Sequence, residues 1–477
     1  MDLYNRLLQY KEEGYYPMHM PGHKRNLGFV MDNPYSIDIT EIEGFDNLHE
    51  AEGILLQSME QAANVFKTKQ SFFLINGSTS GILAGISACT KKGDKIMMAR
   101  NSHKAVYNAV YLRELEPVYL YPSMDESSGI AGSINANEVK RILQQNEDIK
   151  LIVITSPSYE GVISDIKEIA TIAHSYKVPL LVDEAHGAHL SFHDSFPKSA
   201  IALGADIVIQ SIHKTLPAFT QTAILHRNSD LVREEELKRY LSIYQTSSPS
   251  YLLMAGITNC INFLEKDAKI AFEEYVKNLD SFYSQASSLE SIKVWQPSLN
   301  DFCYQRDPSK IIIMSNCKEL TGVKLYEILL NKYKIQVEMT SKNYVLCMTS
   351  VCDTKEGYSR LLQALCEIDE AYKEYGNLIH LEPKYIDFIQ PKIRHLHFEC
   401  VDAKSKQIKL IDSLNQVAAE YVYLYPPGIP ILVPGEVITK EVLDSLFEYK
   451  NSGLSLRGMK DHLGNMIQIF DNDNKLS

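Results

Sequence analysis

The sequence predicts an α/β protein built on a mostly parallel sheet that helices cover on both faces. Between about Ser71 and His226, short apolar runs alternate with amphipathic stretches. The runs are "SFFLI" (71–75), "KIMMA" (95–99), "PVYLY" (117–121), "LIVITSP" (151–157), "PLLVDEA" (179–185), "ADIVIQS" (205–211) and "TAILH" (222–226). Buried strands that alternate with helices are typical of a parallel sheet. Such sheets bind ligands at the carboxyl ends of their strands.

The segments around this sheet predict the remaining domains. Residues 1–50 form an N-terminal arm that opens with a short amphipathic helix, and 51–265 form the large domain with the sheet. Residues 266–375 combine long helical patterns with the strands "KIIIMS" and "NYVLCMTS", which indicates a smaller α+β domain. Residues 376–477 form a C-terminal domain that contains "YPPGIPILVPGEVIT". The prolines of that stretch exclude a helix and a central strand, and leave an ordered loop or a connector.

Composition narrows the class of protein. Of the 477 residues, 45% are hydrophobic and 23% are charged, which is the balance of a globular protein with large cores. The net charge is -12 and no block is rich in Lys or Arg, so nucleic-acid binding is not expected. The start lacks the pattern of a signal peptide, and no apolar run reaches the roughly 20 residues of a membrane helix. Eight scattered cysteines lack the spacing of a metal site. We therefore expect a soluble cytoplasmic protein without a metal or a membrane partner.

The stretch "PLLVDEAHGAHL" (179–190) fits two chemistries. Asp183, Glu184, Ala185 and His186 spell the acidic box of a helicase-type ATPase, or the end of a buried strand that carries one carboxylate to a cofactor. An ATPase also needs a phosphate-binding loop of the form Gly-x-x-x-x-Gly-Lys-Ser/Thr. The sequence contains no such loop, so the ATPase interpretation is rejected.

Three separate pieces of sequence favour the cofactor interpretation. "FFLINGSTSGI" predicts a strand, a turn and a helix, which places Ser78, Thr79 and Ser80 where backbone N–H groups and hydroxyls bind a phosphate. Lys214 lies between two apolar strands, where burial lowers the pKa of an amine and makes it a nucleophile. Asp183 ends another strand and needs a cationic partner. Together they are the parts of a pyridoxal-phosphate site.

A histidine near a fourth strand end completes this hypothesis. His103 follows "KIMMA" in "ARNSHKAV", where its imidazole can stack on the cofactor ring. A second interpretation of the same segment is a helix cap formed by Asn101 and Ser102.

The sequence resembles a known family, the Orn/Lys/Arg decarboxylases, in their shorter Gram-positive form. The matching segments run from end to end in the family's order: "HMPGHKR" (19–25), "DITEIEGFDNLHEAEGIL" (38–55), "FFLINGSTSGI" (72–82), "ARNSHKAV" (99–106), "VDEAHGAHL" (182–190), "IVIQSIHKTLPAFTQTAIL" (207–225), "YQTSSPSYLLMA" (244–255) and "YPPGIPILVPGEVIT" (425–439). The resemblance implies the fold-type-I, aspartate-aminotransferase-like fold of pyridoxal-phosphate enzymes.

The resemblance also implies roles for individual residues. Lys214 would bind pyridoxal phosphate covalently, Asp183 would pair with the ring nitrogen, His103 would stack on the ring and Ala185 would pack beneath it. Ser78, Thr79, Ser211 and His213 would bind the phosphate. Thr246 and Ser247 would reach the phosphate of a neighbouring subunit, which implies a homodimer with shared active sites. His186 joins the cofactor site without an assigned role, because the larger members carry tryptophan at this position.

The implied reaction is decarboxylation of lysine, arginine or ornithine, with Lys214 or His103 returning the proton to Cα. Glu436, held in a proline-rich loop, would bind the distal cation of the substrate, and Glu41 or Asp38 would be the next candidates. The alternatives are another fold-type-I enzyme, such as an aminotransferase or a lyase, and a non-catalytic regulatory protein that keeps the cofactor fold.

Overall fold

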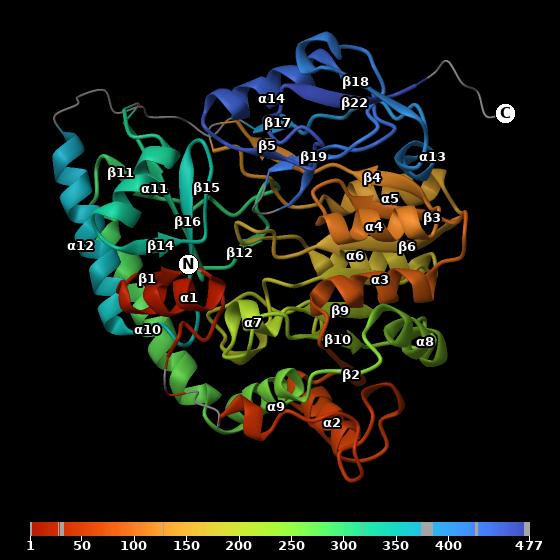
Figure 1. Cartoon of the computed structure of the whole chain (residues 1–477), viewed down its shortest axis with the longest axis horizontal. Coiled ribbons are helices and arrows are strands. Elements are labelled where there is room, and N and C mark those ends of the chain that lie inside the picture. Colours follow the sequence, from red (N-terminus) through yellow and green to blue (C-terminus); the bar gives the residue numbers. More distant parts are fainter. Residues whose placement is uncertain are drawn as a thin grey trace.

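The computed structural model describes residues 2–26, 28, 33–126, 128–317, 319–373, 385–424 and 428–471. Figure 1 shows a large domain around a central sheet, a smaller domain beside it and a C-terminal part above both. The helix α7 (Ile212–Thr215) lies between the large sheet and the smaller domain.

All seven predicted runs belong to one sheet, which has seven strands among the described residues. In spatial order they are β2 (Gln70–Leu74), β10 (Ala223–Arg227), β9 (Ile207–Gln210), β8 (Leu180–Asp183), β6 (Ile149–Thr155), β3 (Lys95–Ala99) and β4 (Glu116–Leu120). Strand β10 runs antiparallel to both of its neighbours, and the other adjacent pairs are parallel. The predicted mostly parallel sheet is therefore confirmed.

Helices cover both faces of this sheet because successive strand residues point to opposite sides. Leu181 of β8 packs with α3 (Gly77–Cys89), α4 (Lys104–Leu112) and α8 (Glu234–Tyr244). Its neighbours Leu180 and Val182 pack on the other face with α2 (Ile54–Phe66), α5 (Ala136–Gln145), α6 (Ile166–Ser175) and α9 (Tyr251–Lys266). Helix α3 lies close to the sheet, since a Cβ atom on Gly81 would be 2.5 Å from Leu74 Cδ1.

The segment predicted as a smaller α+β domain contains an antiparallel sheet and helices. Its strand order is β11 (Ile292–Val294), β13 (Lys310–Ser315), β16 (Tyr344–Met348) and β15 (Met339–Thr340), and its helices are α10 (Ala268–Ala286), α11 (Gly322–Asn331) and α12 (Lys355–Tyr372). The N-terminal arm begins with α1 (Leu3–Glu12) and continues into β1 (Tyr16–Met18), which pairs in parallel with β14 (Ile335–Val337). Part of the arm is thus built into the smaller domain.

The C-terminal part forms a core of its own around Leu432, Val442 and Ile467. Its strands are β18 (Ser405–Lys409) with β22 (Met466–Phe470), and β20 (Pro430–Leu432), β19 (Val422–Leu424) and β21 (Leu456–Arg457). Its helices are α13 (His397–Val401) and α14 (Lys440–Asn451). Strand β17 (Tyr385–Asp387) pairs with β5 (Ser123–Asp125) and joins this part to the large domain.

The proline-rich stretch is only partly described, because residues 425–427 and the predicted domain boundary at 375/376 lie outside the described residues. From Pro430 to Leu432 the stretch is an edge strand, which agrees with the exclusion of a helix and a central strand. The domain limits themselves stay predictions. Among the helices that the structure describes, we find none with the length and apolar character needed to cross a membrane.

Candidate active site

A cavity of about 390 Å³ opens where the carboxyl ends of β3, β6, β8 and β9 meet the start of α3 and helix α7. Nine of the predicted site residues line it: Ser78, Thr79, His103, Asp183, Ala185, His186, Ser211, His213 and Lys214. They are up to 136 positions apart in the chain, from 78 to 214, and a parallel sheet brings them together because its strands end on one edge. The structure thus assembles most of the predicted site.

Lys214 sits in α7, and its Nζ atom is 2.9 Å from Nε2 of His186. Burial lowers the pKa of Lys214, whereas the negative charges of Asp183 and Glu338 oppose this shift. Burial, together with Lys214, also lowers the pKa of His186 well below its usual value. The neutral imidazole can therefore accept a hydrogen bond from the lysine amine, which leaves the amine held inside the cavity.

Asp183 ends β8 and is buried. Burial raises the pKa of Asp183, and the positive charge of Lys214 and a 3.1 Å hydrogen bond from the Ala185 amide oppose the rise. A carboxylate in this position stays charged at low cost only beside a cation. The geometry is suited to pairing with a positively charged ring nitrogen.

Two hydroxyls and a helix end form an anion site in the same cavity. The Oγ atoms of Ser78 and Ser211 are 2.6 Å apart, and Ser78 and Thr79 lie in the first turn of α3. Free N–H groups at a helix start bind phosphate. Gly77 has a φ of +73°, which favours glycine at this turn. Ser80 differs, because its hydroxyl donates to the Gly77 carbonyl oxygen at 2.8 Å and it does not line the cavity.

The histidines of the cavity are neutral. Burial lowers the pKa of His103 to about 4 and that of His213 to about 4. His103 Nδ1 accepts from the Ala105 amide at 3.2 Å as the N-cap of α4, so the proton of the neutral ring is on Nε2. The N-cap is therefore His103 itself and not Asn101 or Ser102, and the stacking of His103 on a cofactor ring stays a prediction. His213 Nδ1 donates to the Thr222 carbonyl oxygen at 2.7 Å.

Three polar atoms of the cavity wall fit a polar ligand. Asn101 Oδ1, Thr155 Oγ1 and His186 Nδ1 are buried, and none of these atoms has a hydrogen-bond partner among the residues that the structure describes. Buried polar atoms are normally paired, so such a group of unpaired atoms indicates a missing partner. The donors, the acceptors and the lysine amine match the ring, phosphate and aldehyde of pyridoxal phosphate.

The sequence alone did not indicate several residues of the cavity. Met20 and Pro21 come from the N-terminal arm, Tyr159 follows β6, Glu338 lies between β14 and β15, and Ile429 belongs to the C-terminal part. For Met20 and Pro21 the sequence did give part of a signal, because both belong to "HMPGHKR", one of the segments that resemble the family. Glu338 offered no signal, because a single acidic residue next to a short strand is usually solvated.

Glu436 does not line this cavity. Its side chain is buried in an ion pair with Arg100, with Oε2 3.0 Å from the guanidinium, and the Val433 amide donates to the same oxygen at 2.9 Å. Asp38 and Glu41 are also absent from the described cavity wall. Substrate binding by Glu436 stays a prediction, and its position in the single chain does not support it.

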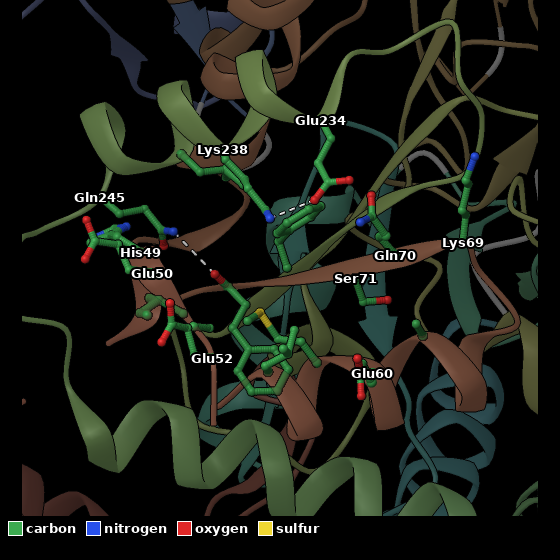
Figure 2. A pocket seen from close by; sticks show the side chains of 18 residues that line it. His49, Glu50, Glu52, Glu60, Lys69, Gln70, Ser71, Glu234, Lys238 and Gln245 are labelled. Carbon is green, nitrogen blue, oxygen red and sulfur yellow. Dashed lines mark hydrogen bonds and ion pairs between the residues drawn. The ribbon is translucent and has the colours of Figure 1, made fainter. Parts of the chain in front are cut away.

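Thr246 and Ser247 are exposed and lie outside the active cavity. They follow Gln245, which lines a second cavity of about 500 Å³ shown in Figure 2. His49 and Gln245 lie at one end of it, and His49 Nε2 is 2.8 Å from the Thr246 carbonyl oxygen. Glu234 and Lys238 form an ion pair of 2.7 Å on its wall. Among the described residues that line this second cavity there is no aspartate.

The chain has the fold of the fold-type-I pyridoxal-phosphate enzymes. A solved structure with this fold is a lysine decarboxylase of Francisella novicida, with a TM-score of 0.80 and 21% identity over 93% of this chain and 76% of that one. The sequence pattern of the Orn/Lys/Arg decarboxylase major domain matches residues 1–357, and that of the C-terminal domain matches 388–463.

Two relatives are similar over nearly their full lengths. An arginine decarboxylase of Bacillus subtilis is 33% identical over 98% of this chain and 97% of that protein. An arginine decarboxylase of Bacillus anthracis is 30% identical over 96% and 95%. The chain belongs to the Orn/Lys/Arg decarboxylase family.

Proposed function

We propose that the protein is a pyridoxal-phosphate-dependent decarboxylase that converts a basic L-amino acid to the corresponding amine and CO2. The observation that carries this proposal is the meeting of Lys214 and Asp183 in one cavity at the carboxyl end of the sheet. Arginine is the first substrate to test, because both Bacillus relatives are named arginine decarboxylases. Lysine and ornithine follow from the family.

Different residues of the cavity would bind different parts of the cofactor. Lys214 would bind the aldehyde carbon, Asp183 the ring nitrogen, and Ser78, Thr79, Ser211 and His213 the phosphate. His103 and Ala185 would cover the two faces of the ring, and His186 would stay beside Lys214. When bound, the cofactor accepts the electron pair that the Cα–carboxylate bond releases.

The chain supports that chemistry by charge and by proton transfer. The negative charge of Asp183 would favour a positively charged ring nitrogen. Lys214 would be the residue that returns a proton to Cα of the substrate, because its amine lies inside the cavity. His103 is the weaker candidate, since a neutral imidazole with a pKa of about 4 for its charged form is a poor acid near pH 7.

One assay separates this proposal from the alternatives. Purified protein with pyridoxal phosphate is incubated with arginine, lysine or ornithine in the absence of a keto acid. Amine and CO2 are expected from at least one of them. Turnover that requires a keto acid would indicate an aminotransferase, and no turnover with bound cofactor would indicate a regulatory protein. Borohydride reduction followed by peptide mapping should place the cofactor on Lys214.

We also propose that the active unit is a homodimer in which Thr246 and Ser247 reach the phosphate in the partner's site. The proposal is supported by the position of Thr246 and Ser247. Both are exposed at the surface next to the second cavity, and neither lines the candidate active cavity of its own chain. A side chain with no role in its own site is free to serve another subunit.

A further inference from the structure

We propose that Glu338 binds the distal cation of the substrate and so selects basic amino acids. This inference rests on the proposed function and deepens it. Glu338 lines the active cavity at the junction of β14 and β15, on the side of the smaller domain.

The carboxylate of Glu338 is held in place by two donors. The Met20 amide donates to Oε2 at 2.9 Å, and the Tyr159 hydroxyl donates to Oε1. Tyr159 also packs edge-on against His186, with ring centroids 4.6 Å apart, and His186 contacts Lys214. The carboxylate of Glu338 is therefore fixed on the wall of the cavity that also contains Lys214, and its remaining lone pairs are available to a ligand.

The balance of charge in the cavity leaves Glu338 without a cation. Among the lining residues that the structure describes, the charged side chains are Asp183, Glu338 and Lys214, because the histidines are neutral. In the proposed reaction Asp183 and Lys214 would both bind the cofactor, so Lys214 would not serve as the cation for Glu338. A carboxylate that loses water without gaining a cation is strongly disfavoured. A substrate with an ammonium or a guanidinium removes this cost, and a neutral side chain does not.

Glu338 and Glu436 differ in the way that this role requires. Glu338 is partly accessible from the cavity, whereas Glu436 is 1% exposed and already paired with Arg100. An accessible carboxylate can exchange water for a ligand cation. A sealed ion pair would first have to open.

The test compares a diamine, which carries a distal ammonium, with the monoamine that lacks this group. Cadaverine and n-pentylamine are titrated into the holoenzyme, and binding is followed by the cofactor absorbance and by calorimetry. Wild-type protein should bind cadaverine at least about tenfold more tightly, in line with one charge-assisted contact. Glu338→Gln keeps the shape and should bring the two amines within about twofold. Glu60→Gln, in the second cavity, is the matched control and should retain the wild-type preference.

Kinetics provide a second readout. Glu338→Gln should raise KM for the best basic substrate at least about tenfold, and the cofactor spectrum should be unchanged. If Glu338→Gln does not fold, Tyr159→Phe is used, since it removes one donor to Glu338 and should reduce the preference for cadaverine. An unchanged preference in the soluble variant would overturn the role of Glu338. Because amine binding needs no turnover, a wild-type protein that decarboxylates no basic amino acid would refute the proposed function separately.

Discussion

Burial shifts the two central residues of the cavity in opposite directions. It lowers the pKa of Lys214 and raises that of Asp183, and each residue opposes the shift of the other through its charge. Each residue therefore favours the charged form of the other. A cationic ring nitrogen held by Asp183 would oppose the rise in its pKa in the same way.

Asp183→Asn should keep the cofactor and lose most turnover. The amide cannot hold a positive charge on the ring nitrogen, so the barrier should rise by several kcal/mol, about the effect of removing a principal electrostatic group. The measurements are cofactor content and kcat for the best substrate. Rates near those of wild type would contradict the role of Asp183.

The Glu436–Arg100 pair gives a buried carboxylate a structural role. Arg100 also donates to the Pro430 carbonyl oxygen at 2.6 Å and to the Ile431 carbonyl oxygen at 3.2 Å. The pair therefore fastens strand β20 of the C-terminal part to the large domain. Removing one partner of a buried pair leaves an uncompensated charge.

Glu436→Gln should reduce the free energy of unfolding by about 3 kcal/mol or more, because it leaves Arg100 buried without a counter-charge. Chemical denaturation checks this value. Glu234→Gln breaks an exposed pair with Lys238 and should cost less than about 1 kcal/mol. Wild-type stability combined with a raised KM would instead support substrate binding by Glu436.

At the scale of elements, the segment from β1 to Lys24 joins the lysine helix to the smaller domain. The Gly22 amide donates to the His213 carbonyl oxygen at 2.7 Å, and the Ser350 hydroxyl donates to the Gly22 carbonyl oxygen at 2.5 Å. Lys24 is buried, and its ammonium donates to the Met348 carbonyl oxygen at 2.6 Å. Gly22 and Lys24 of "PGHKR" therefore hold this segment in place by hydrogen bonds to the lysine helix and to the smaller domain.

Gly22→Ala should destabilise the protein by about 1–3 kcal/mol and lower activity, as an overpacked site does. Its Cβ atom would lie 2.7 Å from both N and O of Leu216, so the segment or the loop after Lys214 must shift. Thermal unfolding and kcat/KM report the two effects. Gly53→Ala is the control, since its Cβ would meet atoms at 3.6 Å or more. Equal behaviour of the two variants would show that the close contact is unimportant.

In the whole molecule, the N-terminal arm, the large domain, the smaller domain and the C-terminal part each contribute residues to the active cavity. The large domain supplies Lys214 and Asp183, the N-terminal arm Met20, the smaller domain Glu338 and the C-terminal part Ile429. The cavity therefore forms only when these parts are packed together. The proposed dimer would add Thr246 and Ser247 from a second chain.

Mixing two inactive variants tests the shared site. Lys214→Ala subunits are combined with subunits that carry Thr246→Ala and Ser247→Ala, and partial activity should return. One of the two sites in each hybrid dimer would then have all its parts, so recovery should approach about a quarter of wild-type activity for random exchange of equal amounts. Subunit exchange is verified with tagged chains. Exchange without recovery would argue against shared sites.

Much of the fold and part of the site were predictable because their signals are local. The seven strands follow from apolar runs of the right length, and the turn before α3 follows from its Gly, Ser and Thr residues. Lys214, Asp183 and Ser78 were predictable for the same reason, since each lies at the end of a predicted strand, and parallel strands end together at one edge of the sheet.

Tertiary structure alone decided which carboxylates face the cavity. Glu436 was expected there and is sealed against Arg100, whereas Glu338 was not singled out and lines the wall beside Tyr159. The pairing of β1 with β14 brings residues more than 300 positions apart together, and the buried Glu436–Arg100 ion pair fastens strand β20 to the large domain. Packing between distant segments sets these positions, and no period or turn in the sequence encodes them, because local patterns specify an element and its buried face but not its distant neighbours.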